Sequence, residues 1–170
     1  MLSSILTKKQ CSECKFCCSF RRKSAWETPL FPKPTIDRLE KKYDAFPIRQ
    51  VKNSFTYDLQ PGYRTQNPEE EQPCPFLDAS DGCTLDENDK PFDCKIWPLR
   101  IMKKENELVI ALTPTCPAVN TLPLEQVKKL VTQEGTGETI YREAERFPDI
   151  VKEYREGYPI LMSRRAASGY

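Results

Sequence analysis

The stretch Cys11-Ser12-Glu13-Cys14-Lys15-Phe16-Cys17-Cys18 decides the fold, because it holds four of the eight cysteines in a C-x2-C-x2-C-C pattern. Two intervening residues are enough to reverse the backbone, so a C-x2-C turn can direct two sulfur atoms at one metal ion. A third sulfur can join the same centre or a neighbouring one. The sequence therefore predicts a metal-binding cysteine knuckle with the rest of the chain arranged around it.

Cys17 and Cys18 are adjacent, and we expect their side chains to diverge. Two such thiolates do not easily bind one small tetrahedral ion. Two interpretations stay open: the pair serves two different metal ions, or one cysteine binds metal and the other supports it.

The other four cysteines are spread over positions 74 to 116, and each has a proline or glycine nearby. Rigid turns suit metal ligation, because ligands that are fixed beforehand lose less entropy when the centre forms. The alternative is that these thiols are buried apolar fillers. Together with the knuckle they predict metal binding by most of the eight, and the candidate ligands are Cys11, Cys14, Cys17, Cys18, Cys74, Cys83, Cys94 and Cys116.

The composition narrows the classes of function. Histidine is absent, which excludes histidine metal ligands, a Ser-His-Asp triad and a Cys-His pair. A net charge of +1 provides no field toward nucleic acid or an anionic membrane, so neither is an expected partner. We find no membrane-spanning run and no signal peptide, and we expect a cytoplasmic protein with reduced thiols. In a secreted chain the cysteines could form disulfides instead.

A length of 170 residues favours a single domain over residues 1–170, and 15 prolines against 6 glycines favour short elements between rigid loops. We predict a small α+β fold around a cysteine-ligated centre, with its core motif over 11–117. The expected elements are a two-turn helix from Thr35, a β-like stretch over 48–59, a turn at Pro61-Gly62, a loop over 67–73, a short helix after Pro91, a hairpin of 99–102 with 108–112, a helical segment over 122–156 that includes 149–154, and a loose tail from 164.

All-sulfur ligation is typical of iron–sulfur clusters and of structural zinc. The opening of the bacterial ferredoxin pattern matches Cys11, Cys14 and Cys17, and then fails because Arg21-Arg22 stand where Cys-Pro should. A zinc ribbon needs a second C-x2-C knuckle, which the later region lacks. We therefore expect an iron–sulfur cluster such as [4Fe–4S], with zinc as the alternative.

Basic and aromatic side chains flank the cysteines. The basic ones could offset the negative charge of a thiolate centre or could simply be solvated; they are Lys15, Arg21, Arg22, Lys23 and Lys95. The aromatic ones are expected to shield the centre from water; they are Phe16, Phe20, Phe76, Phe92 and Trp97.

Three further segments extend the pattern: Cys74-Pro75-Phe76-Leu77, Gly82-Cys83, and residues 90–98, which read Lys-Pro-Phe-Asp-Cys-Lys-Ile-Trp-Pro. With the knuckle, this order resembles the cysteine-cluster family named for its C-x2-C-x2-C-C signature. The resemblance implies a zinc- or iron-chelating domain related to the cysteine domain of flagellin lysine N-methylase. Lys90 and Lys95 stand where that family has arginine, which removes a bidentate guanidinium. No G-x-G-x-x-G loop follows a strand, so no methyl-donor pocket is located.

Three classes of function follow, and the sequence does not decide whether the protein is an enzyme. In the first, a cluster performs redox chemistry or modifies a protein substrate, with a redox partner. In the second, structural zinc supports an interaction module. In the third, the protein is a metal chelator or carrier. The sequence leaves the oligomeric state open.

Overall fold

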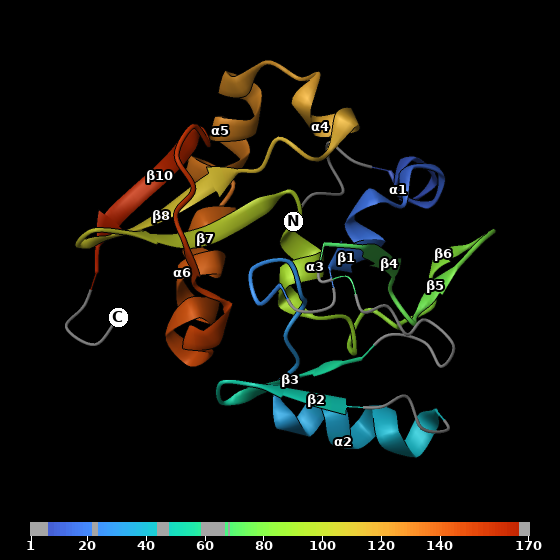
Figure 1. The fold of residues 1–170 in the computed structure, drawn as a ribbon. Coiled ribbons are helices and arrows are strands. Elements are labelled where there is room, and N and C mark those ends of the chain that lie inside the picture. Colours follow the sequence, from blue (N-terminus) through green and yellow to red (C-terminus); the bar gives the residue numbers. More distant parts are fainter. Residues whose placement is uncertain (1–6, 22–23, 44–47, 59–66, 68, 167–170) are drawn as a thin grey trace. The chain divides into compact units, whose positions relative to one another are not determined.

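The structure is a computed structural model, and it describes residues 7–21, 24–43, 48–58, 67 and 69–166. The fold class is α+β, as predicted, with short strands and several helices (Figure 1). The described chain forms two compact units, one over Thr7–Lys95 and the other from Ile96 onward. A single domain over residues 1–170 stays a prediction. None of the described helices is long and apolar enough to cross a membrane.

The described residues of the unit over Thr7–Lys95 form three antiparallel two-stranded sheets, which pair β1 with β4, β2 with β3, and β5 with β6. Sheets this small are marginal alone, so the loops and helices around them must help to fix them. Its elements are α1 (Lys8–Cys14), the 3-10 helix η1 (Phe16–Cys18), β1 (Ser19–Arg21), α2 (Lys33–Lys42), β2 (Ile48–Val51), β3 (Ser54–Tyr57), β4 (Glu71–Pro73), β5 (Leu77–Asp78), β6 (Gly82–Cys83) and α3 (Phe92–Ile96), which ends just past the boundary.

A small apolar core supports this unit. Ile36 and Leu39, one turn apart on α2, are fully buried and pack with Phe31, Tyr57 and Phe76. The ring of Tyr57 meets the ring of Phe76 edge to face, with 4.9 Å between centroids, a favourable aromatic geometry. Since Phe76 lies two residues after Cys74, this core fixes the start of the second cysteine region.

The second unit is built on a sheet with strand order β10-β8-β7-β9. The predicted hairpin is confirmed as β7 (Leu99–Lys104) paired with β8 (Glu107–Leu112), and it is buried along most of its length. β10 (Ile160–Arg165) runs antiparallel to β8, and the short β9 (Lys152–Glu153) runs parallel to β7. Before them come α4 (Pro117–Asn120), α5 (Leu124–Thr132), α6 (Thr136–Arg146) and the 3-10 turn η2 (Pro148–Ile150).

Helices α5 and α6 pack against each other and on this sheet (Figure 1). The predicted apolar stripe of α5 is confirmed, because Val127, Leu130 and Val131 are all buried. On α6, the hydroxyl of Tyr141 donates a hydrogen bond to the carbonyl oxygen of Leu108 in β8 at 3.2 Å. The helices are therefore fixed to the sheet without any contribution from cysteine.

Several predicted boundaries are wrong. Residues 149–154 are not a helix but the end of η2 followed by β9, and residues 164–165 belong to β10 rather than to a loose tail. The loop over 67–73 ends in the strand β4, and α2 begins at Lys33 rather than near Thr35. The expected turn at Pro61-Gly62 lies outside the described residues.

Candidate metal centre

The first cysteines lie on a helix, which corrects the predicted C-x2-C turn. α1 begins with a capping box in which Thr7 accepts from the N–H of Gln10 and the Gln10 side chain accepts from the N–H of Thr7. It ends at Lys15, whose φ of 54° is left-handed. Between these two ends, Cys11 and Cys14 stand three residues apart and share one face. The helix can therefore present both thiols to one ion.

Helix α1 is held against the turn between β5 and β6. Gly82 has a φ of +79°, and a Cβ built on it would lie 3.3 Å from both the Cα and the Cβ of Ser12. The ammonium of Lys15 donates to the carbonyl oxygen of Ala79 in the same turn. Because Ser12 follows Cys11 and Gly82 precedes Cys83, this close approach brings the C-x2-C helix beside Cys83.

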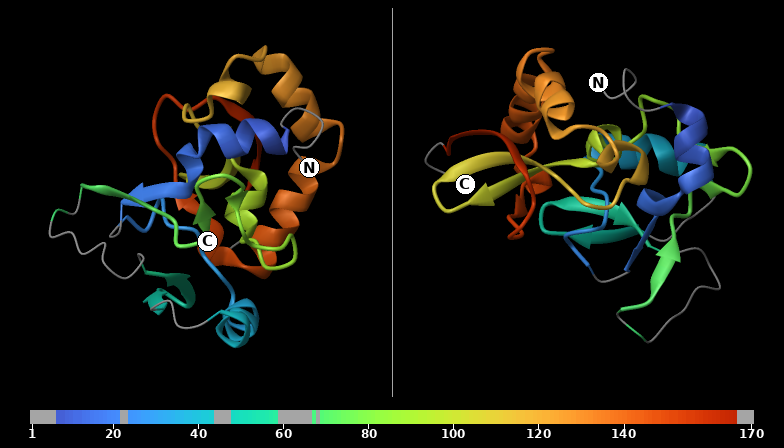
Figure 2. Two further views of the ribbon diagram at one scale, coloured as in Figure 1. Left: turned by 90° about the vertical axis from the view of Figure 1, so that its right-hand side faces the viewer. Right: turned by 90° about the horizontal axis from the view of Figure 1, so that it is seen from above.

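The vicinal pair follows α1 directly and occupies η1. The thiols of Cys17 and Cys18 form a hydrogen bond, which raises the pKa of Cys17. The expectation that the two side chains diverge is therefore wrong for this pair. The left panel of Figure 2 shows α1 leading toward β1 through this segment. The pair can act on one centre together.

Backbone pairing joins the two cysteine regions. The N–H of Cys74 donates to the carbonyl oxygen of Cys18 at 2.7 Å, and Ser19 of β1 pairs with Pro73 of β4. A few residues later, Cys83 pairs with Leu77 across the β5–β6 hairpin. Hydrogen bonds between main-chain groups thus fix the spacing between Cys18, Cys74 and Cys83.

Cys94 reaches the same region from α3. Its N–H donates to the carbonyl oxygen of Pro91 at 3.0 Å, as expected for a first turn that follows a proline. The neighbouring Asp93 is 2 % exposed, and its carboxylate accepts from the N–H of Leu30 at 3.3 Å. Asp93 therefore fixes α3 to the loop before α2, a positioning contact that the sequence analysis missed.

The thiols of the later region interact with one another and with the vicinal pair. Burial raises the pKa of Cys94, and so do the negative fields of Cys74 and of the adjacent Asp93, followed by those of Cys17 and Cys83. Burial also raises the pKa of Cys74 to about 12, with smaller contributions from Cys83 and Cys17. Thiols from four segments thus lie near enough for the charge on one to oppose the charge on the next.

Lys90 is the cation that this cluster faces. Burial opposes its charge, yet the fields of Cys83, Cys94 and Glu87, and more weakly of Cys18, raise the pKa of Lys90. In the sequence, Lys90 stands out only as a replacement for arginine. The signal available was its position four residues before Cys94, next to Pro91.

The predicted basic flanks have other partners. Lys95 lies 3.9 Å from Glu87, while Arg22 and Lys23 lie outside the described residues. Among the aromatic flanks, Phe20 and Phe76 are buried, but Phe16 is 49% exposed and does not shield the thiols as expected.

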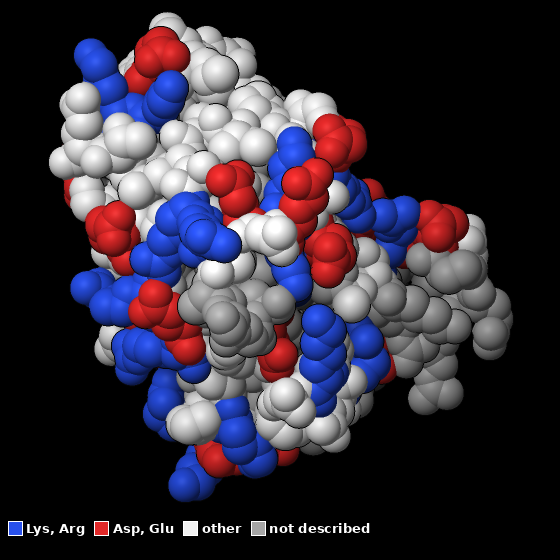
Figure 3. All heavy atoms as spheres, turned by 90° about the vertical axis from the view of Figure 1, so that its left-hand side faces the viewer, with Lys and Arg blue, Asp and Glu red and all other residues white. Residues whose placement is uncertain are grey.

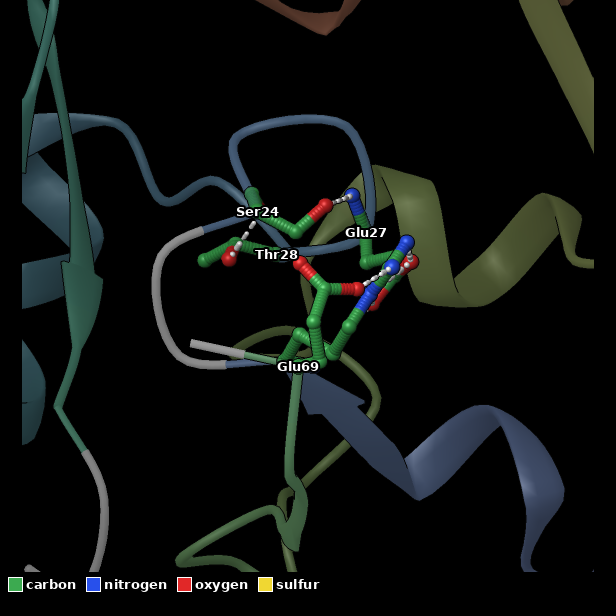
Figure 4. A network of polar contacts seen from close by, with 5 residues as sticks. Ser24, Glu27, Thr28 and Glu69 are labelled. Carbon is green, nitrogen blue, oxygen red and sulfur yellow. Dashed lines mark hydrogen bonds and ion pairs between the residues drawn. The ribbon is translucent and has the colours of Figure 1, made fainter. Parts of the chain in front are cut away.

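An ion-pair network follows the knuckle. The guanidinium of Arg21 donates to Glu27 and, at 2.6 Å, to Glu69, which precedes β4 (Figure 4). Ser24 closes the intervening turn, since its carbonyl oxygen accepts from the hydroxyl of Thr28 at 2.6 Å. The network fixes the far end of the β1–β4 pair, whose near end adjoins Cys18 and Cys74.

The predicted ligands are only partly brought together. Cys17, Cys18, Cys74, Cys83 and Cys94 interact electrostatically, directly or through Lys90, and α1 places Cys11 and Cys14 beside Cys83. Cys116 belongs to the other unit, where it is buried before α4, and its role as a ligand stays a prediction. Across the described residues, no three Cys, Asp or Glu side chains form a ready-made metal site.

Comparisons with known proteins supply no family for this chain. No family model matches it, and searches of curated proteins and of solved structures find no match. The resemblance to the cysteine-cluster family therefore depends on the motifs alone.

Proposed function

We propose that this protein binds a metal centre through clustered thiolates, with Cys18, Cys74, Cys83 and Cys94 as its main ligands and Cys17 at its rim. The observation that carries the proposal is the main-chain hydrogen bond of 2.7 Å from the N–H of Cys74 to the carbonyl oxygen of Cys18, which joins the two cysteine regions. The fields of Cys74 and Cys83 on Cys94 agree with this arrangement.

The donor set fits a cation. Without metal, burial and mutual repulsion oppose the ionisation of Cys74 and Cys94, so these thiols stay protonated. A bound cation reverses that balance, because the thiolate is the ligand and each ligand releases its proton on binding. Lys90 would offset part of the remaining negative charge. Cys11 and Cys14 are exposed thiols outside this main ligand set, and Cys116 stays a candidate ligand.

An iron–sulfur cluster is the proposed occupant and zinc the alternative. Four thiolates with no histidine suit either centre. A cluster would supply redox chemistry, directed at a protein substrate or redox partner, whereas zinc would act in structure or transport. Nucleic acid is not a proposed partner, and on the face in Figure 3 basic and acidic side chains are interspersed. A cytoplasmic location would keep the thiols reduced.

Anaerobic purification followed by iron, zinc and sulfide analysis tests the proposal. We expect stoichiometric metal in the wild type, its loss in Cys74→Ser and Cys94→Ser, and retention in the matched control Lys33→Gln, a surface variant of α2. Acid-labile sulfide with visible absorbance identifies a cluster, and colourless protein with zinc identifies the alternative. Wild-type protein that holds no metal under these conditions would refute metal binding.

A further inference from the structure

The seven cysteines of the unit over Thr7–Lys95 fall into two classes by exposure. Cys11, Cys14 and Cys17 are exposed, whereas Cys18, Cys74, Cys83 and Cys94 are half-buried. If the cysteines served only to hold the metal, burial of every ligand would strengthen binding, because exclusion of water strengthens each metal–thiolate interaction. The exposed class therefore requires a separate explanation.

Cys11 and Cys14 have the geometry of a two-coordinate site open to solvent. They lie one turn apart on the same face of α1, whose ends are fixed by the Thr7 capping box and by Lys15. Neighbours at this spacing have Cβ atoms about 5–6 Å apart, which allows two sulfur atoms to bind one ion. An ion that prefers four ligands keeps its other positions available for exchange.

Two structural links connect Cys11 and Cys14, the exposed pair on α1, with the half-buried thiols. The first is the close approach of Ser12 to Gly82, since Ser12 directly follows Cys11 and Gly82 directly precedes Cys83. The second is the chain itself, because the exposed Cys17 is followed directly by the half-buried Cys18, whose carbonyl oxygen accepts from the N–H of Cys74 at 2.7 Å. Exposed and half-buried donors are therefore contiguous.

We propose that Cys11 and Cys14 form an acquisition site that takes a thiophilic divalent cation from solution and passes it through Cys17 and Cys83 to the half-buried thiols. This inference rests on the proposed function and adds a path of entry to it. Each step is a ligand exchange in which one metal–sulfur bond forms as another breaks. The incoming thiol gives its proton to solvent, the departing thiolate takes one up, and the oxidation state of the metal does not change.

The test measures how fast metal enters and how firmly it stays. Metal-free protein is mixed in a stopped-flow instrument with Zn²⁺ held by a chromophoric chelator, and the loss of the zinc–chelator absorbance gives the loading rate. For Cys11→Ser/Cys14→Ser we expect loading at least about tenfold slower, equivalent to about 1.4 kcal/mol in the barrier, with unchanged resistance of the final zinc to a competing chelator.

Two variants keep this result interpretable. Cys14→Ser alone changes one exposed side chain, and it should slow loading several-fold in a protein with wild-type circular dichroism. Glu13→Gln, a change at an exposed position between the two cysteines, should load at the wild-type rate.

The outcomes that would overturn the acquisition site differ from the one that would overturn the proposed function. Wild-type loading rates in both cysteine variants would overturn the acquisition site and leave the metal centre intact. Loss of the firmly held zinc from Cys11→Ser/Cys14→Ser would also overturn it, because the pair would then belong to the resident centre. A wild type that takes no zinc, iron or cluster would instead overturn the proposed function.

Discussion

The backbone N–H of Cys74 donates to the carbonyl oxygen of Cys18 at 2.7 Å, so residues 56 positions apart are joined by main-chain atoms. Neither the N–H nor the carbonyl group of this bond is a thiol, so the bond does not itself require the thiols to be ionised. The approximate position of the two cysteine regions is therefore specified before metal binds, and metal binding has to order side chains more than it has to close the loop.

Removal of metal should loosen the cysteine segments and spare the other unit. We expect amide exchange in residues 11–21 and 74–94 to become at least about tenfold faster after complete chelation, about 1.4 kcal/mol in local opening. Helices α5 and α6 are packed on their sheet by contacts that contain no cysteine, so their exchange should not change. Hydrogen exchange with mass spectrometry resolves these segments, and unchanged protection in the first two would contradict the prediction.

The vicinal cysteines should not be equivalent. Cys18 is half-buried and Cys17 is exposed, so Cys18→Ser should remove firmly held metal while Cys17→Ser mainly slows its entry. Metal per chain after dialysis against a chelator measures the first effect, and the stopped-flow rate measures the second. Equal and complete loss of metal from both variants would indicate that the two thiols share one polynuclear centre.

Stability of the metal-free protein should fall at alkaline pH. Burial raises the pKa of Cys74 from 9.0 to about 12, so the folded state holds this proton more tightly than the unfolded state. The contribution is fully present below about pH 9 and is lost as pH rises toward 12. Urea midpoints should fall between about pH 8 and about pH 10.5, and less steeply in Cys74→Ala. An identical fall in the variant would show that other groups cause it.

Gly82→Ala should disturb α1, and Gly157→Ala is the matched control. Both glycines have a positive φ, +79° and +87°, so alanine costs about 1–2 kcal/mol at either position. Only at Gly82 would the new Cβ crowd Ser12, because nothing lies within 4 Å of the corresponding position at Gly157. Amide protection of residues 11–15 should therefore fall in Gly82→Ala alone. Equal protection there in both variants would argue against the close approach of α1.

Arg21→Gln should destabilise the unit over Thr7–Lys95 more than a change at an isolated surface arginine, since it breaks an ion-pair network with both Glu27 and Glu69. Arg146→Gln is the control, because Arg146 is 72% exposed and pairs with Glu143 on its own helix. Urea unfolding at low and high salt measures both, and the Arg21 effect should shrink in salt. A cost no larger than that of the control would mean that the network adds nothing to stability.

The pattern of apolar and polar residues correctly predicted those elements that are specified by residues close together in the sequence. The hairpin of β7 and β8 follows from two apolar runs around a polar turn, and the stripe of α5 follows from apolar residues at helical spacing. β9 was missed because Lys152 and Glu153 are polar and become a strand only through parallel pairing with Met102 and Lys103 of β7. Nothing in their immediate sequence carries that information.

The candidate metal site likewise combines features that the local sequence indicates with features that depend on contacts between distant segments. Clustered cysteines led to the prediction of metal binding, but the helix that carries Cys11 and Cys14 was missed although Thr7-Lys8-Lys9-Gln10 is a capping-box sequence. The position of Cys94 could not be predicted from the sequence, since it depends on the anchoring of α3 by Asp93 to Leu30. Such contacts join segments that no spacing rule connects.

The contact of α1 with Gly82 also has an evolutionary consequence. One inserted residue between Cys11 and Cys14 would rotate the second thiol by about 100° about the helix axis, so the length of this segment is under stronger selection than its composition. Position 12 admits only small side chains, because Ser12 already lies against the β5–β6 turn. Glu13 is 66% exposed, so we expect this position to accept many different amino acids. Related chains should therefore vary at position 13, stay small at position 12, and show no insertions or deletions from 11 to 14.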